Sequence, residues 1–435
     1  MKILFISNIF TPHVRGGYEL GCQTIANEYQ KNGHEVSIAT SRVFGKLYKS
    51  NLDHSLDVRQ IFEPVLAYEE SNNNLNNIYS KIIRNDALAG SINSNNLALV
   101  NFITQYQPEF VWLFNPLGLG PIGIVETLLS LKIPFCIHLM ENIDGVIRDH
   151  QPYTHSYSKW ARLKKESYAI SCSSFISQIN QHYTSYKVCK LIPNGVRFPH
   201  INQYTNKITK NNLEKEFHIV YFGQVAVKKG ILQSIRAVKQ LKDQRPDLVI
   251  KFEIYGSGDP SFVESINNLI TKLDIEKVVF LAGTVRQSDL FERIRDADLA
   301  IMLLSSDEPF AYAPIEATAL GLPVVLPKNV SNASYFPDDY GLLIDNRDDF
   351  TEIANKISKH ADTVKKRQLL SNQLFKKLKY KLDLEESILP SYDEYINEIV
   401  NENKLSVNNI QMPSALFNSY EIQDYRSFFQ YNIFN

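Results

Sequence analysis

Two glutamates, Glu308 and Glu316, are separated by seven residues in the segment DEPFAYAPIEATALGLPVV. The apolar run at 298–304 that precedes them is typical of a buried parallel strand. A helix is expected to begin near Pro314. Proline has no N–H group, and it fits the first position of a helix because the N–H there has no partner inside the helix. This spacing predicts Glu308 in the loop at the carboxyl end of a strand and Glu316 in the first turn of the next helix. Ligands of open α/β sheets bind at that edge.

Carboxylates at this edge suit a ligand that carries hydroxyl groups, since a carboxylate is a strong hydrogen-bond acceptor. Ala313 is a poor N-cap, so the first N–H groups of the helix lack an obvious side-chain partner and can receive a phosphate. Hydroxyls on one side and phosphate on the other describe a nucleotide-sugar pocket. The alternative is that Glu316 complements the helix dipole and that Glu308 is a solvated loop charge.

Strand-like apolar runs alternate with helical patterns along most of the chain. In the first half we expect strands at 2–8, 34–40, 110–114, 134–138 and 169–171, a short strand before Pro193, and a helix from Tyr18. From Phe217 we expect strands at 219–222, 249–255, 278–281, 298–304 and 323–326, with helices beginning near Ile231, Pro260, Ser288 and Pro314. Two successive arrays of this kind predict an α/β protein with two doubly wound parallel sheets.

The expected divisions are a first domain at 1–200, a polar linker at 201–216, a second domain at 217–385, a terminal helix at 386–400 and an aromatic-rich extension at 401–435. Aromatic content is unusual for a disordered end, so the extension is expected to pack on the body of the protein or on a partner.

Composition excludes several classes of protein. The net charge of −1 over 435 residues gives no reason to expect nucleic acid as a partner. The four cysteines form no CxxC pair, which indicates neither a zinc site nor a disulfide framework, and favours a cytoplasmic location. The longest apolar region, 111–140, is interrupted by prolines and charges and is too broken for a membrane span.

Six short motifs occur in order along the chain. They are Arg15-Gly16-Gly17-Tyr18-Glu19, Asn32-Gly33-His34-Glu35-Val36-Ser37, Ile192-Pro193-Asn194-Gly195-Val196, Tyr221-Phe222-Gly223-Gln224 through Lys229-Gly230, Tyr255-Gly256-Ser257-Gly258, and the two glutamates at 308 and 316. Their order and spacing resemble those of retaining glycosyltransferases of family four. The resemblance implies the GT-B fold, in which two Rossmann-like domains face each other across a cleft.

The resemblance also implies roles for individual residues. Donor binding, with a nucleotide-diphosphate sugar as co-substrate, would fall to Gly16, Gly17, Gln224, Lys229, Glu308 and Glu316, and catalysis to His138, Lys229 and Glu308. Glycines let the backbone approach a phosphate at a helix N-terminus, although a turn that only reverses the chain would need them too. Lys229 would stabilise the charge on the leaving diphosphate. Glu308 would bind the sugar hydroxyls, Glu316 the ribose, and His138 the donor sugar near the reacting centre.

Two positions depart from the family pattern. Gln224 stands where arginine is usual, and an amide cannot replace the bidentate contact of a guanidinium with phosphate. The phosphates would then be held by Lys228 and Lys229, or by Arg15 or Arg197. The remaining alternative is that the donor is bound less tightly. Ala311 replaces a glycine and would narrow the pocket beside the sugar.

The predicted function is transfer of a sugar, with retention of configuration, to a hydroxyl of a glycan, lipid-linked or small-molecule acceptor in glycan, polysaccharide or glycoconjugate biosynthesis. No cofactor and no metal are expected, since Asp296-Ala297-Asp298 is formally a DxD but spans a helix end and a strand start. The alternatives are a non-catalytic, glycosyltransferase-like binding subunit, or a GT-B enzyme of another reaction type such as a sugar-nucleotide epimerase.

The Asn-rich segment 72–96 is expected to be an insertion that faces the acceptor, or a plain solvated loop. The extension offers a contact with a protein partner or with the inner membrane face.

Overall fold

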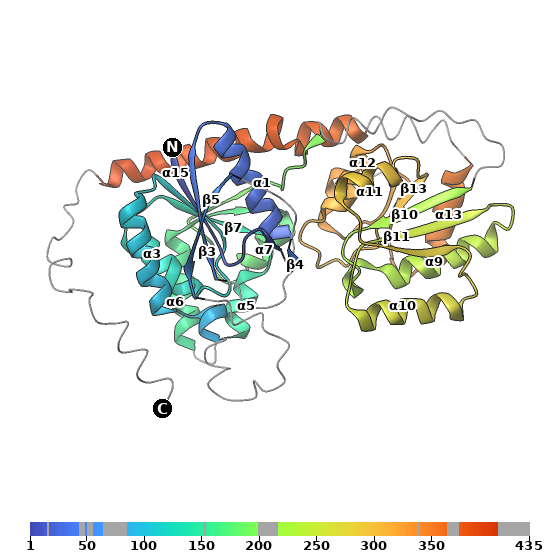
Figure 1. Cartoon of the computed structure of the whole chain (residues 1–435), viewed down its shortest axis with the longest axis horizontal. Helices are drawn as coiled ribbons and strands as arrows, with labels where there is room; N and C mark the ends of the chain where they lie inside the picture. The colour runs from blue at the N-terminus through green and yellow to red at the C-terminus, as the bar shows by residue number, and fades with distance from the viewer. Residues whose placement is uncertain are drawn as a thin grey trace.

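The chain forms two α/β domains that lie side by side along the long axis of the molecule, as the computed structural model shows (Figure 1). The structure describes residues 1–14, 17–42, 48–49, 55–63, 85–150, 154–198, 216–337, 340–362 and 374–407. The predicted linker at 201–216, apart from its last residue, falls outside these ranges, and so does most of the predicted extension at 401–435.

The first domain is built on a seven-stranded parallel sheet with the order β5-β3-β1-β6-β7-β8-β9. Its strands are β1 (Lys2–Ser7), β3 (Glu35–Ser41), β5 (Asp57–Phe62), β6 (Phe110–Asn115), β7 (Phe135–Leu139), β8 (Tyr168–Ser171) and β9 (Val188–Leu191). Helices α1 (Gly17–Lys31), α3 (Asn93–Tyr106), α4 (Pro121–Ser130), α5 (Ile143–Asp149), α6 (Thr154–Glu166) and α7 (Ser174–Asn180) flank it. The central strands β1 and β6 are buried over nearly their whole length, because a parallel sheet is covered on both faces. A short antiparallel pair, β2 (His13–Val14) and β4 (Tyr48–Lys49), lies apart from this sheet.

The second domain has a six-stranded parallel sheet with the order β12-β11-β10-β13-β14-β15. Its strands are β10 (Phe217–Phe222), β11 (Ile250–Tyr255), β12 (Val279–Gly283), β13 (Leu299–Ile301), β14 (Val324–Pro327) and β15 (Leu343–Ile344). They alternate with helices α9 (Ile231–Gln244), α10 (Pro260–Lys272), α11 (Gln287–Ile294), α12 (Tyr312–Ala319) and α13 (Phe350–Ala361), and with the short 3-10 helices η2 (Val227–Lys229) and η3 (Ser331–Tyr335). The two doubly wound sheets that the sequence predicts are therefore both present.

The last described helix returns along the first domain (Figure 1). This helix, α15 (Leu389–Val407), follows a π-helical turn, η4 (Leu384–Ile388). Tyr29 of α1 donates a hydrogen bond of 2.7 Å to Asp393, and Tyr395 donates one of 3.2 Å to the Val188 carbonyl. The helix continues past residue 400 to Val407, so the predicted boundary of the extension at 401 lies inside it.

The start of α12 differs from the prediction. The helix begins at Tyr312 rather than near Pro314, so Glu316 lies beyond its first turn and the N-cap is Ala311 rather than Ala313. The reason is a long-range contact: the Asn332 side chain accepts a hydrogen bond of 2.8 Å from the Ala311 N–H and donates one of 2.9 Å to its carbonyl. This clamp fixes the helix start from outside the segment.

Glycines fix the loop that follows β10. Gly230 ends η2 with a φ of +71°, and a Cβ there would come within 1.8 Å of the Leu303 carbonyl oxygen. A Cβ at Gly256 would likewise come within 1.8 Å of the Gly223 carbonyl oxygen. Backbone therefore lies directly on backbone at both positions, and only glycine permits it.

No helix in the described ranges of the chain is both long enough and apolar enough to cross a bilayer.

The Gly230 contact predicts a difference in stability between alanine substitutions at two glycines with the same φ. Gly283 also has a φ of +71°, but nothing lies within 4 Å of its would-be Cβ. Gly283→Ala should therefore cost only the left-handed strain, about 1 kcal/mol, whereas Gly230→Ala adds a backbone clash and should cost about 3 kcal/mol or more. Urea unfolding of the two variants measures this, and equal losses would show that the Leu303 contact is relaxed without cost.

Candidate functional site

Lys229 and Glu308 form an ion pair at the carboxyl edge of the second sheet. Lys229 is the last residue of η2, after β10, and Glu308 lies in the loop after β13. The Lys229 Nζ is 2.7 Å from Glu308 Oε1, and the more exposed Lys228 Nζ is 3.9 Å from Oε2. The structure thus brings together two of the residues that the sequence assigns to the site.

Glu308 is buried, with 6% of its surface exposed, yet one of its oxygens is unsatisfied. Oε2 has no hydrogen-bond partner among the residues that the structure describes. A buried carboxylate oxygen left in this state costs free energy, because it has lost water without gaining a donor. The arrangement is suited to a ligand that brings a hydroxyl or another donor to this oxygen.

Glu316 lies on α12, eight residues after Glu308, and is partly exposed. The N-terminus of α12 has no side-chain cap, so its first N–H groups are oriented toward the same edge of the sheet as Glu308. Asn332 holds the main chain of Ala311, and Ser331 donates a hydrogen bond of 3.3 Å to the Glu308 carbonyl. The helix η3 therefore supports the segment from 308 to 316.

Gln224 is exposed in the loop between β10 and η2. Its carbonyl accepts a hydrogen bond of 2.7 Å from the Tyr221 hydroxyl. Burial, and secondarily the charge of Glu308, raise the pKa of Tyr221, so this tyrosine remains a neutral donor that holds the loop. Of the two arginines considered as substitutes for the family arginine, Arg15 lies outside the described residues, and Arg197 is paired with Glu28 of α1.

The first domain contributes the N-terminus of α1. Gly16 lies outside the described residues, and Gly17 is the first residue of the helix. A Cβ at Gly17 would lie 3.6 Å from Cε2 of Tyr312, and one at Gly21 would lie 3.4 Å from the Tyr312 hydroxyl. Tyr312 of the second domain therefore packs against the glycine face of α1, and the two domains are in contact here. Sequence reasoning missed this tyrosine, although it lies between the two glutamates.

His138 is fully buried in β7. Its ring stacks on Phe114 at 4.4 Å between centroids, and the rings of Trp112 and Tyr392 lie 6.0 Å away. The sequence predicts a side chain that points toward the cleft edge, whereas aromatic residues of β6 and α15 enclose it in the structure. Neither ring nitrogen has a hydrogen-bond partner among the described residues. Burial lowers the pKa of His138 to about 4, while the nearby Asn194 amide opposes the shift, so the imidazole is neutral.

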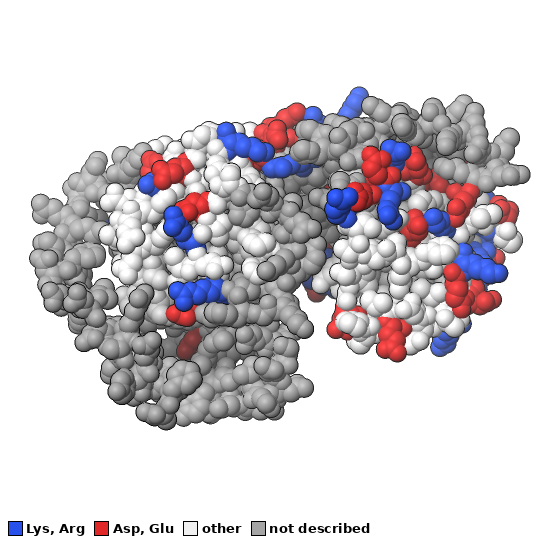
Figure 2. Space-filling model, in the orientation of Figure 1, with Lys and Arg blue, Asp and Glu red and all other residues white. Residues whose placement is uncertain are grey.

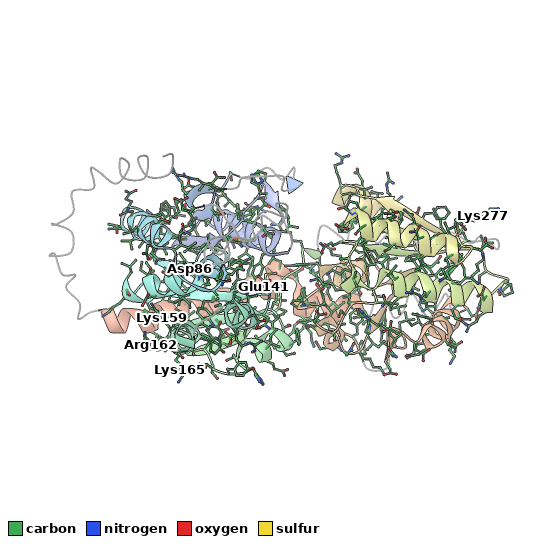
Figure 3. The ribbon with its side chains drawn as sticks, turned by 90° about the horizontal axis from the view of Figure 1, so that it is seen from below. Asp86, Glu141, Lys159, Arg162, Lys165 and Lys277 are labelled. Atoms are coloured by element: carbon green, nitrogen blue, oxygen red, sulfur yellow. The ribbon has the colours of Figure 1, made fainter. Side chains whose placement is uncertain are left out.

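Charged residues outside this site are widely distributed. Figure 2 shows lysines, arginines and acidic residues interspersed over the visible face of the second domain, so no field of one sign covers that face. Figure 3 shows Lys159, Arg162 and Lys165 of α6 on the side of the first domain turned away from the second. Glu141, which follows β7, lies on the side toward the second domain (Figure 3).

The DxD at 296–298 lies at the opposite edge of the sheet. Asp298 immediately precedes β13 and accepts a hydrogen bond of 2.9 Å from the main-chain N–H of His218, the second residue of β10. Within the described ranges, no three His, Cys, Asp or Glu side chains are grouped as metal ligands would be.

Comparisons with known proteins bear on the second domain most directly. Residues 203–377 match the family of glycosyl transferases group 1. The chain is 31% identical over 133 residues to the D-inositol 3-phosphate glycosyltransferase of Pseudarthrobacter chlorophenolicus, a match that covers 30% of this chain and 31% of that protein. The chain thus spans about a third of the length of this curated relative. A protein of Methanocaldococcus jannaschii described as an uncharacterized glycosyltransferase is 26% identical over 345 residues, covering 75% of this chain and 80% of its own.

Solved structures share the architecture over more than nine-tenths of the chain. Anabaena HepE in complex with UDP has a TM-score of 0.64 at 17% identity, covering 94% of this chain and 100% of its own. The sucrose-phosphate synthase of Thermosynechococcus elongatus has a TM-score of 0.66 at 14% identity, covering 92% of this chain and 99% of its own. Together with the two parallel sheets, these similarities confirm the predicted GT-B fold, and the family match supports the glycosyltransferase superfamily.

The burial of His138 predicts how stability depends on pH. Between pH 4 and 6.5 the unfolded histidine binds a proton that the folded one does not, so the free energy of unfolding falls as the pH is lowered through that range. His138 should account for a loss of about 2 kcal/mol between pH 7 and pH 5. Urea unfolding at both pH values should show this loss in the parent and not in His138→Phe. The prediction fails if both proteins lose the same free energy.

Proposed function

We propose that the protein is a retaining, metal-independent glycosyltransferase that moves a hexose from a nucleotide-diphosphate sugar to a hydroxyl acceptor. The observation that carries the proposal is the Lys229–Glu308 pair at the carboxyl edge of the second sheet, with the second Glu308 oxygen buried and unsatisfied. The site places a cation beside a hydrogen-bond acceptor. The cation suits the diphosphate of a nucleotide sugar, and the acceptor oxygen suits a hydroxyl of the adjoining sugar. The group 1 match spans this pair.

In this proposal the ion pair is the resting arrangement of the donor site. Bound diphosphate would compete with Glu308 for Lys229, and a sugar hydroxyl would donate to the carboxylate. Lys229 then stabilises the charge that develops on the leaving group, where an electrostatic contact contributes most. Glu316, on α12, would bind the ribose hydroxyls, and the uncapped N-terminus of that helix would add N–H groups for phosphate.

The reaction would proceed on one face of the sugar. The bond from the anomeric carbon to the diphosphate oxygen breaks, the bond to the acceptor oxygen forms on the same face, and the acceptor proton passes to the departing phosphate. No protein nucleophile is then needed, in contrast to retaining hydrolases with paired carboxylates. His138, which the sequence assigns to catalysis, is enclosed by aromatic rings and is given no contact with the donor sugar in this proposal.

UDP is the nucleotide to test first. HepE, which shares the fold, has been solved with UDP and with UDP-glucose. The test is release of nucleotide diphosphate from UDP-sugars by the purified protein in excess EDTA, with NMR of the product to identify the anomer. An inverted product, or activity that requires magnesium or manganese, would refute the corresponding part of the proposal. The absence of nucleotide binding with every donor tested would refute the proposal as a whole.

Glu308→Gln should reduce turnover more than donor affinity. The amide keeps the shape but loses the charge-assisted contact with the sugar hydroxyls, and about a tenfold or greater loss in turnover is expected. The exposed neighbouring Asp307 provides the control, since Asp307→Asn removes an equal charge one residue away. Steady-state kinetics of both variants test the assignment, and parent-like turnover in Glu308→Gln would overturn it.

Lys229→Ala should lower turnover by about a hundredfold or more, because the lost cation faces the leaving group. Lys228 is the adjacent lysine, 3.9 Å from Glu308 and more exposed, so Lys228→Ala should have a much smaller effect. Equal losses in the two variants would show that the lysines share the role.

Glu316→Ala should weaken nucleotide-sugar binding by about 1–3 kcal/mol, the scale of a lost charged hydrogen bond. Calorimetric titration with the donor measures this directly. An unchanged dissociation constant would remove Glu316 from the ribose site.

A further inference from the structure

A cavity of about 540 Å³ lies between the two domains. The first domain contributes Ser174, Phe175 and Gln178 of α7, and the second contributes residues of the β14–η3 segment, chiefly Asn329, Ser331 and Ser334. Its volume falls within the roughly 300–1,000 Å³ typical of small-molecule sites. None of these residues belongs to the donor site proposed above.

One hydrogen bond and one electrostatic interaction relate this cavity to Glu308. Ser331, which lines it, donates a hydrogen bond of 3.3 Å to the carbonyl of Glu308. Behind the opposite wall, buried Cys172 lies two residues before the lining residue Ser174, and the charge of Glu308 adds to the effect of burial in raising the pKa of its thiol to about 12. Glu308 is therefore close to both walls.

Two of the three serine hydroxyls that line the cavity are arranged to accept hydrogen bonds. Ser331 already donates to the Glu308 carbonyl, and Ser334 already donates to the Ser331 carbonyl at 2.9 Å. A serine that donates its one hydrogen has only lone pairs left for a ligand. Ligand hydroxyls can donate to these oxygens, whereas a fully ionised phosphate cannot.

Charge and shape favour the same class of ligand. Among the described residues that line the cavity, Lys328 alone is charged, and its Nζ is 2.7 Å from Asp345, which neutralises it. Buried Val330 and Ala333 give an apolar floor, and the partly exposed Phe175 offers an aromatic face. Polar oxygens around an apolar surface suit the hydroxylated rim and C–H face of a sugar ring.

We propose that this cavity between α7 and η3 is the acceptor subsite, and that it takes an uncharged, hydroxyl-rich acceptor such as a neutral glycoside. The inference rests on the proposed transferase function. Occupants of the cavity would present a hydroxyl to the sugar held at Glu308, while phosphorylated or carboxylated acceptors would find no uncompensated cation in the lining.

A pair of serine variants tests the location. Ser334→Tyr fills the rim of the cavity, and Ser265→Tyr on α10 is the control, because Ser265 is equally an exposed serine that donates to the carbonyl three residues earlier. Ser334→Tyr should reduce transfer to acceptors by about tenfold or more, with UDP affinity and acceptor-independent release of UDP unchanged. Ser265→Tyr should match the parent in all three measurements.

Three outcomes decide the location. Transfer that falls no further in Ser334→Tyr than in Ser265→Tyr would place the acceptor elsewhere. A loss of UDP affinity in Ser334→Tyr would assign the cavity to the donor. If the parent binds no nucleotide at all, the transferase function fails first, so the two failures are distinguishable.

Paired acceptors test the charge preference. Neutral p-nitrophenyl glycosides should accept sugar, and the corresponding sugar 6-phosphates should be poorer acceptors. Asp345→Asn should reduce the difference in transfer rate between neutral glycosides and sugar 6-phosphates, because Lys328 loses its ion-pair partner. Transfer to the sugar phosphates alone, or to none of the neutral glycosides while UDP release continues, would overturn the proposed acceptor class.

Discussion

The candidate site depends on a contact between two main chains. Gly230 lies against the Leu303 carbonyl at a distance that no side chain allows, and it does so with a φ that favours glycine. This contact draws the loop after β10 onto the loop after β13. As a result, Lys229 and Glu308, which are far apart in sequence, come within 2.7 Å of each other. The chemistry of the site follows from a packing constraint.

Burial of the Glu308 carboxylate in the ion pair lowers the stability of the folded protein. Removing a carboxylate from water is offset only by good geometry and by partners for both oxygens, and Glu308 has a partner for one of them. A pair that served stability alone would be fully satisfied or replaced by apolar residues. Incomplete satisfaction at a domain boundary is instead typical of a site that awaits a ligand. The proposed acceptor cavity is connected to the same residue, since Ser331, which lines the cavity, donates a hydrogen bond to the Glu308 carbonyl.

The sequence predicted the parts of the fold that local patterns determine. Buried strands such as β6 and β10 stand out as apolar runs, and the glycine motifs indicate where the backbone makes close contacts. Two edge strands were not predicted: half of the residues of β5 (Asp57–Phe62) are polar, and β15 (Leu343–Ile344) is very short. Long-range contacts account for the remaining differences. Asn332 moves the start of α12, and Tyr392, distant in sequence, helps to enclose His138. The Tyr312 contact with α1 likewise requires knowledge of how the domains meet.

A crystal structure of the protein with UDP would test the central claim most directly. A diphosphate oxygen should lie within hydrogen-bond distance of the Lys229 Nζ in place of the contact with Glu308, and the ribose should lie at Glu316. Nucleotide bound elsewhere, with the Lys229–Glu308 pair unchanged at 2.7 Å, would contradict it.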